Sequence, residues 1–142
     1  MESQKINLAP PLEGTPRYGI SAGVFLVFGV VFGALGAHAM ERLLDGDGVD
    51  AFVTASHYLM VMGAAMLGAL STGQEKGLGL VLWGTVLFSG SIFGLLLGPA
   101  VGCPLPILGP VTPLGGGLMI AGWTRWTWSF FQSARRSYSR GL

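Results

Sequence analysis

Two histidines are the first residues of this chain to consider for chemistry, because imidazole is a common ligand of haem, pigments and metals. His38 lies at the end of the first apolar run and His57 lies inside the second. An ionisable side chain in a membrane segment is a functional candidate by default. However, zinc needs three or four ligands, and Cys103 is on a different loop. We therefore favour a hydrogen bond within the hairpin over ligation. We expect no bound metal or cofactor, with His38 and His57 as the alternative ligands.

Other polar residues also lack the pattern of a reactive site. Ser89 and Ser91 lie within an apolar run, where hydroxyls usually bond a carbonyl one turn back. The glycines at 115–117 resemble a phosphate cradle, but no Lys-Ser/Thr pair follows them as in a P-loop. Asp45 and Asp47 faintly resemble a calcium loop that lacks its final glutamate. The sequence therefore predicts that the protein is not an enzyme.

The composition indicates the class of protein. Hydrophobic residues make up 51% of the chain and charged residues only 11%, against about 25% charged in soluble domains. Disordered chains are instead rich in charge. Nucleic-acid binders carry a basic excess, whereas the net charge here is +1. The single cysteine excludes a disulfide-linked secreted domain. A small membrane protein with several spans fits these numbers.

The positions of the charged residues define the expected spans. Long neutral stretches separate them, and a span needs about 20 apolar residues. Prolines interrupt the longest stretch between 99 and 113, and proline ends helices. We predict an all-α fold, a bundle of four transmembrane helices at about 18–40, 51–72, 77–98 and 114–131. Outside this 18–131 domain lie a polar N-terminal arm at 1–17, which does not resemble a cleavable signal peptide, and a basic tail at 132–142.

The basic residues predict the orientation of the bundle. With four spans, both termini lie on one side of the membrane. That side would carry seven of the eight Lys and Arg residues, and the other side only Arg42. Basic residues concentrate on the cytoplasmic side of membranes. We therefore expect both termini to face the cytoplasm, or the matrix in a mitochondrion.

Small residues at four-residue spacing indicate where helices approach one another, because they permit close backbone contact in lipid. The expected packing positions are Gly29, Gly33, Ala37, Gly90, Gly94 and Gly98. They fit either a dimerisation face or a seam inside the bundle. We favour the seam in the first helix, and therefore expect Gly33→Leu to unfold the monomer.

Three tryptophans and one arginine gather near the end of the fourth expected helix: Trp123, Trp126, Trp128 and Arg125. Tryptophan prefers the membrane interface, and arginine can extend towards the headgroups. We interpret these residues as interface anchors. A stacking platform for a quinone or a pigment is the alternative.

Five short motifs occur in an order that resembles a known family. They are Gly33-Ala34-Leu35-Gly36-Ala37-His38, then Phe52-x-Thr54-Ala55-x-x-Tyr58-x-Met60, Leu87-Phe88-Ser89-Gly90-Ser91, Thr112-Pro113-Leu114-Gly115-Gly116 and Gly122-Trp123. They resemble the four-helix membrane proteins of "domain of unknown function" family four-two-three, over residues 29–123. Animal relatives are the transmembrane protein two-five-six group, associated with mitochondria. The resemblance implies a histidine where this chain has Met62.

The resemblance implies no established activity, so we expect a non-catalytic accessory subunit of a large membrane complex. A respiratory-chain assembly in the mitochondrial inner membrane is the first choice, with a bacterial inner membrane as the alternative. Residues 1–17 and 124–142 would contact partner subunits, and lipids would complete the contacts. A small transporter or channel, or a pigment- or haem-binding subunit, is the alternative function.

The orientation can be tested in sealed vesicles by protease protection. A reporter after Leu142 should lie on the cytoplasmic or matrix side, and a tag inserted at Asp47 on the opposite side, because the basic residues define the inner face. Finding Leu142 on the same side as Asp47 would contradict this topology.

Overall fold

Four long α-helices form most of residues 15–140, the part of the chain that the computed structural model describes. They are α1 (Thr15–His38), α2 (Gly46–Ser71), α3 (Leu78–Leu97) and α4 (Val111–Arg140). Short 3-10 helices lie in the connections: η1 (Met40–Arg42), η2 (Pro99–Val101) and η3 (Pro106–Leu108). No strand occurs between residues 15 and 140. The all-α, four-helix prediction is confirmed.

Local chemistry explains several helix ends. The Asp45 side chain accepts a hydrogen bond from the Gly48 N–H at 2.8 Å and so caps α2, which begins earlier than the expected residue 51. Gly77, with φ of +97°, precedes α3 in a conformation that glycine adopts readily. Pro99 follows the last turn of α3.

The fourth helix is longer than expected. It begins at Val111 and has 30 residues, so residues 132–140, expected as a separate tail, continue the helix. No proline or glycine interrupts 123–140. The expected arm at 1–17 lies largely outside the described residues, which begin at residue 15. Its last three residues, 15–17, form the start of α1.

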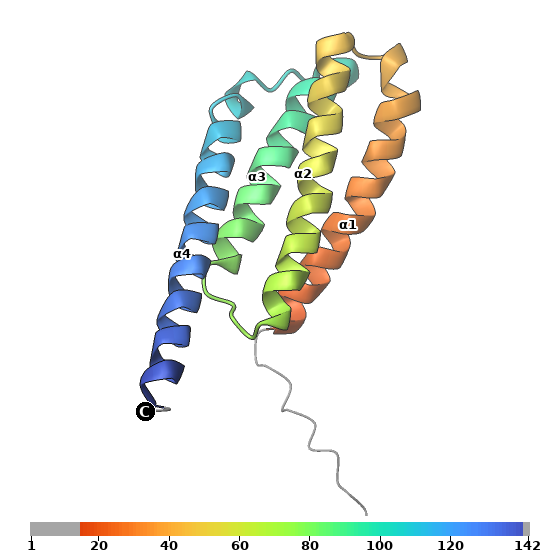
Figure 1. Ribbon diagram of the computed structural model, residues 1–142. Helices are drawn as coiled ribbons and strands as arrows, with labels where there is room; N and C mark the ends of the chain where they lie inside the picture. The colour runs from red at the N-terminus through yellow and green to blue at the C-terminus, as the bar shows by residue number, and fades with distance from the viewer. Residues whose placement is uncertain (1–14, 141–142) are drawn as a thin grey trace, which may run out of the picture.

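The helices run alternately up and down, so α1 begins and α4 ends at the same end of the bundle (Figure 1). Each helix packs on its neighbour in the sequence, and α1 also touches α3. Within residues 15–140, the backbone of α4 makes no close contact with α1 or α2. The last turns of α4 extend beyond the other helices (Figure 1).

Three of the helices have the length and apolar composition of a membrane span: α1 from Pro16 to His38, α2 and α3. A span of about 30 Å requires about 20 residues at ~1.5 Å each. Although α4 is longer still, it mixes apolar residues with Gly115–Gly117, several threonines and Arg125. That α4 also crosses the membrane therefore remains a prediction.

The contact between α1 and α2 follows steps of three and four residues in α1. Buried positions are Tyr18, Ala22, Phe25, Gly29 and Gly36. A Cβ on Gly29 would lie 2.9 Å from the Met60 backbone N, so only glycine fits there. Gly33 was expected in this seam, but a Cβ there would meet nothing within 4 Å, and Ala37 is exposed. The reason is geometric. At ~3.6 residues per turn, each step of four residues turns about 40° beyond a full turn, so a series with this spacing moves away from the contact with α2.

The contact between α3 and α4 depends on backbone-to-backbone packing at glycines. A Cβ on Gly84 would lie 2.7 Å from the Met119 N and 2.8 Å from the Gly115 O. A Cβ on Gly122 would lie 2.8 Å from the Val81 N. Contacts this short leave no room for a side chain on either helix, so α4 lies directly on the α3 backbone.

The expected glycine series of α3 faces its following loop and open space rather than another helix. A Cβ on Gly94 would lie 2.5 Å from Leu108 Cδ1, and one on Gly98 would lie 2.5 Å from the Cys103 O. Gly90 is exposed, and a Cβ there would meet nothing within 4 Å.

Two glycines of α3 give a matched test. Gly84→Ala should lower the free energy of unfolding by about 1–3 kcal/mol, because the added methyl group is forced against backbone atoms. Gly90→Ala should raise it by about 0.5–1 kcal/mol, because alanine favours the helix and the space is open. Thermal unfolding in detergent, followed by circular dichroism, measures both changes. An equal effect of the two variants would contradict the seam described above.

Candidate functional site

An apolar groove with a volume of about 820 Å³ lies between α2 and α4, and α3 forms its base. α2 contributes Tyr58 and Met62, and α3 contributes Phe88. The other lining residues come from α4 between Gly116 and Phe131, a distance of about 22 Å at ~1.5 Å per residue. The groove exists because the backbone of α4 contacts α3 but not α2.

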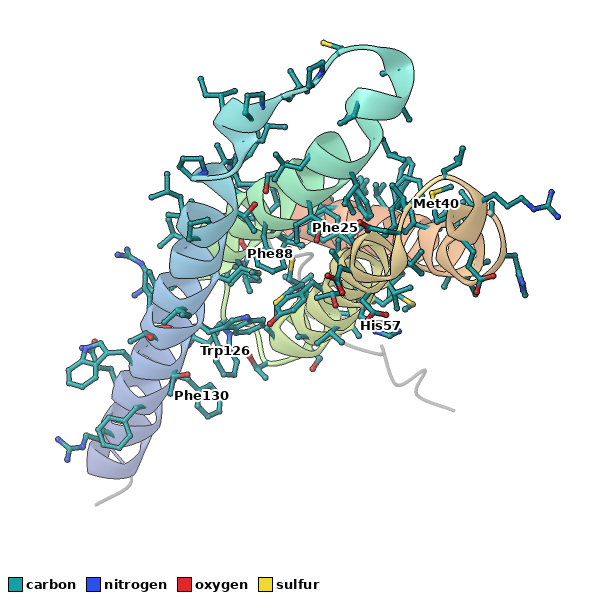
Figure 2. The ribbon with its side chains drawn as sticks, turned by 90° about the horizontal axis from the view of Figure 1, so that it is seen from above. Phe25, Met40, His57, Phe88, Trp126 and Phe130 are labelled. Atoms are coloured by element: carbon teal, nitrogen blue, oxygen red, sulfur yellow. The ribbon has the colours of Figure 1, made fainter. Side chains whose placement is uncertain are left out.

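Aromatic and sulfur contacts shape the groove. The rings of Tyr58 and Phe88 lie with centroids 4.6 Å apart, and Phe88 lies between α2 and α4 (Figure 2). The Trp123 Nε1–H donates a hydrogen bond to the Met62 Sδ at 3.3 Å. This side-chain contact joins α4 to α2, the two helices on either side of the groove. The Met62 position, where the resemblance implies a histidine, is therefore part of the groove.

Hydroxyl groups hold α3 to the helices on either side. The Ser89 Oγ, which is buried, donates to the Ala55 O of α2 at 2.9 Å. The Ser91 Oγ lies 2.7 Å from the Thr112 Oγ1 of α4. In the described residues, no buried side-chain N or O atom lacks a hydrogen-bond partner. Ser89, expected to bond within its own helix, instead links α3 to α2.

The expected interface anchors of α4 have different surroundings. Trp126 donates from Nε1 to the Gln74 O at 3.1 Å and stacks on Phe130, with ring centroids 5.4 Å apart; both rings lie towards the other helices (Figure 2). Trp123 also packs inward. Trp128 is 64% exposed, and Arg125 is exposed as well.

The motif residues divide between the core, the groove and the surface. Four of them line the groove: Tyr58, Phe88, Gly116 and Trp123. Phe52 and Gly36 are buried where α1 meets α2, and Gly115 is buried against α3. His38 and Gly90 are exposed. Residues that are far apart in the sequence are therefore brought together at the groove.

The two histidines do not form a site with other described residues. Both are exposed, and His57 lies on the side of α2 away from α4 (Figure 2). Neither side chain makes a hydrogen bond to residues 15–140, so the side-chain hydrogen bond expected within the hairpin does not form there. Within that range, no group of three or more His, Cys, Asp or Glu residues could hold a metal.

The groove is suited to binding an apolar partner. Its polar side-chain groups are hydroxyls and indole N–H groups, from Tyr58, Thr124, Thr127, Trp123 and Trp128. Hydroxyls can donate and accept hydrogen bonds, but unaided they are poor proton acceptors and nucleophiles. The lining therefore offers surface and shape rather than a reactive group.

Sequence reasoning missed two features near this site. Met62 was treated only as a departure from the family pattern, although it forms a wall of the groove. Trp83 was not considered, although it is 63% exposed on an apolar helix. An isolated tryptophan near the start of a span was the available signal, because tryptophan prefers the interface.

Comparison with known proteins places these residues in a family. A family model described as a protein of unknown function (DUF423) matches residues 32–116. A UPF0382 membrane protein of Schizosaccharomyces pombe is 39% identical over 100 residues, 66% of this chain and 84% of the relative. A UPF0382 membrane protein of Staphylococcus saprophyticus is 33% identical over 113 residues, 70% of this chain and 90% of the relative. One from Bacillus subtilis is 30% identical, over 70% and 89% of the two chains. No solved structure matches the chain.

The packing beneath the groove can be tested through the hydrogen bond that joins α3 to α2, from the Ser89 Oγ to the Ala55 O. Ser89→Ala should lower the free energy of unfolding by about 0.6–1.5 kcal/mol, because it removes an interhelical hydrogen bond. Ser56→Ala is the matched control, since Ser56 is equally buried but bonds the Phe52 O of its own helix. An equal loss of unfolding free energy in Ser89→Ala and Ser56→Ala would show that the bond to Ala55 does not stabilise the packing of α3 on α2.

Proposed function

The chain belongs to the DUF423 family, whose relatives are membrane proteins, and from this premise we propose that it is a non-catalytic accessory subunit of a larger membrane protein complex. The single observation that carries the proposal is the uncovered groove between α2 and α4. Four motif residues from three helices meet there, and the rest of the described chain does not cover them.

The shape of the groove favours a membrane helix of another subunit as its occupant. The lining follows α4 over about 22 Å, about three quarters of the ~30 Å hydrocarbon thickness. About four turns of a straight apolar helix fit along this distance, and helix association in lipid relies on close packing beside small residues. Gly116 is the small residue in the lining, with open space above it.

A respiratory-chain assembly is the complex that we favour. The resemblance to mitochondrial proteins supports this choice, and such assemblies occur in both bacterial and mitochondrial inner membranes. The relatives come from bacteria and from a yeast, which fits either membrane. The part of α4 from 124 to 140 supplies further contact surface, because α4 extends beyond the bundle (Figure 1). Partner contacts are also proposed for the arm at 1–17, most of which lies outside the described residues.

The alternative functions have less support. A transporter needs polar residues that face a cavity, whereas His57 lies on the side of α2 away from the groove (Figure 2). A haem site with two ligands needs histidines on facing helices, and His38 and His57 are both exposed. We therefore keep a transporter, and a pigment- or haem-binding subunit, as outcomes of the experiment below.

Two adjacent glycines of α4 allow a controlled test of the groove. A Cβ on Gly116 would meet only Phe88 Cδ2, at 3.9 Å, whereas one on Gly117 would meet nothing within 4 Å. Gly116→Leu should therefore fill the groove without a backbone clash, and Gly117→Leu should leave it open. On native gels of gently solubilised membranes, we expect the wild type and Gly117→Leu to migrate far above the 14.8 kDa of the chain. Gly116→Leu should migrate as the released chain.

Mass spectrometry of the wild-type band identifies the complex, and respiratory-chain subunits are the expected partners. A wild-type chain that migrates alone would contradict the proposal. Retention of both variants would show that the groove is not the contact. A band with a visible absorption spectrum lost in His38→Ala or His57→Ala would favour the pigment or haem alternative, and ion flux in liposomes lost in His38→Ala would favour the transporter.

A further inference from the structure

A second cavity, with a volume of about 420 Å³, lies at the end of the bundle where α1 and α3 begin. Its lining comes from Tyr18 of α1, the loop between α2 and α3, the first turns of α3, and Arg125 of α4. This cavity shares no residue with the groove. Its volume is within the range of about 300–1,000 Å³ typical of small-molecule pockets. We call this cavity the basic pocket.

Positive charge reaches the basic pocket from separate parts of the chain. Lys76 comes from the loop between α2 and α3, and Arg125 from α4; Glu75 is the acidic residue of the lining. Arg17 adds a third cation at the edge, where its Nη2 donates to the Tyr18 Oη at 2.9 Å. The lining therefore has an excess of positive charge and attracts an anion.

Among the described residues, basic groups outnumber acidic ones at this end of the bundle. Arg135 lies further along α4 at the same end. The opposite end carries four acidic residues and one basic residue, Arg42; the acidic residues are Glu41, Asp45, Asp47 and Asp50. A cavity at that acidic end is lined by Glu41 and Asp50 together with Leu44, Gly46 and Val49. Charge complementarity thus selects one end for an anionic ligand.

The start of α3 gives the pocket its shape. Gly77 precedes α3, and no side chain caps the helix there. The positive end of the helix dipole therefore adds to the charge of the three cations. Gly79 keeps the pocket open, because a Cβ at this position would lie 3.2 Å from the Tyr18 Oη. A larger side chain at 79 would narrow the space between α1 and α3.

Trp83 indicates that the pocket lies at the level of the lipid headgroups. It lines the pocket, and its side chain is 63% exposed. Exposed tryptophan on a membrane helix marks the interface between headgroups and hydrocarbon. Further along the same side of α3, Val86 and Gly90 are exposed. Cations at the interface and an apolar surface beyond them match the two parts of a phospholipid.

We propose that the basic pocket binds the phosphate headgroup of an anionic phospholipid, whose acyl chains lie along the exposed side of α3 beyond Trp83. Basic pockets between membrane helices on the inner side commonly bind such headgroups. A free phosphate would use the cations but not the apolar surface. This proposal does not depend on the proposed function, because it uses none of the groove residues.

The experiment is native mass spectrometry of the full chain in detergent, titrated with phosphatidylglycerol or with phosphatidylcholine of the same acyl chains. We expect preferential retention of phosphatidylglycerol by the wild type. The double variant K76Q/R125Q should weaken its retention about thirtyfold, because two cations near an anionic headgroup together contribute about 2 kcal/mol of electrostatic attraction. The matched control is R42Q/R135Q, which removes the same charge outside the pocket and should retain the lipid as the wild type does.

Circular dichroism shows whether each double variant keeps its helix content, so loss of lipid is separated from loss of fold. Equal weakening in both double variants would overturn the proposal, because it would indicate general attraction by net charge. Equal retention of phosphatidylcholine, or no retention of phosphatidylglycerol, would also overturn it. Displacement of the lipid by inorganic phosphate at equal concentration would show a site for soluble anions instead.

Discussion

The direct contact between the backbones of α3 and α4 determines most of this structure. Gly84, Gly115 and Gly122 remove the side chains that would otherwise separate the two helices. Close backbone approach provides dispersion energy in lipid, where the hydrophobic effect does not drive helices together. Since α4 is held this tightly on α3, it does not reach the backbone of α2. The groove is the result.

Two surfaces of different chemistry follow from this arrangement. The groove is apolar, and its lining follows α4 from Gly116 to Phe131. The basic pocket lies at the end where α3 begins, with cations and a tryptophan around it. An apolar helix suits the first and an anionic headgroup the second. On the two proposals above, the protein would contact a membrane helix at the first surface and a lipid at the second. The two surfaces share no residue, so substitutions in one need not affect the other.

Much of the fold follows from the sequence, because charged residues are excluded from apolar spans and prolines interrupt helices. The central parts of all four helices lie where these patterns predict. The seams were harder to predict: Gly33 fits a four-residue series, yet the contact follows alternating steps of three and four that include Gly29 and Gly36. The groove could not be predicted, because it depends on how far α4 lies from α2. Likewise, the inward hydrogen bonds of Trp123 and Trp126 depend on Met62 and the Gln74 carbonyl, which are distant in sequence.

The order in which the helices pack also bears on how the protein is made. Apart from the contact of α1 with α3, each helix packs on the one before or after it in the sequence. Such a topology has low contact order, and chains of this kind fold quickly because loop closure costs little entropy. The α1–α2 hairpin can therefore form while α3 and α4 are still being synthesised, and α4 can dock last onto a finished surface. Biogenesis then needs no rearrangement of helices already in the membrane.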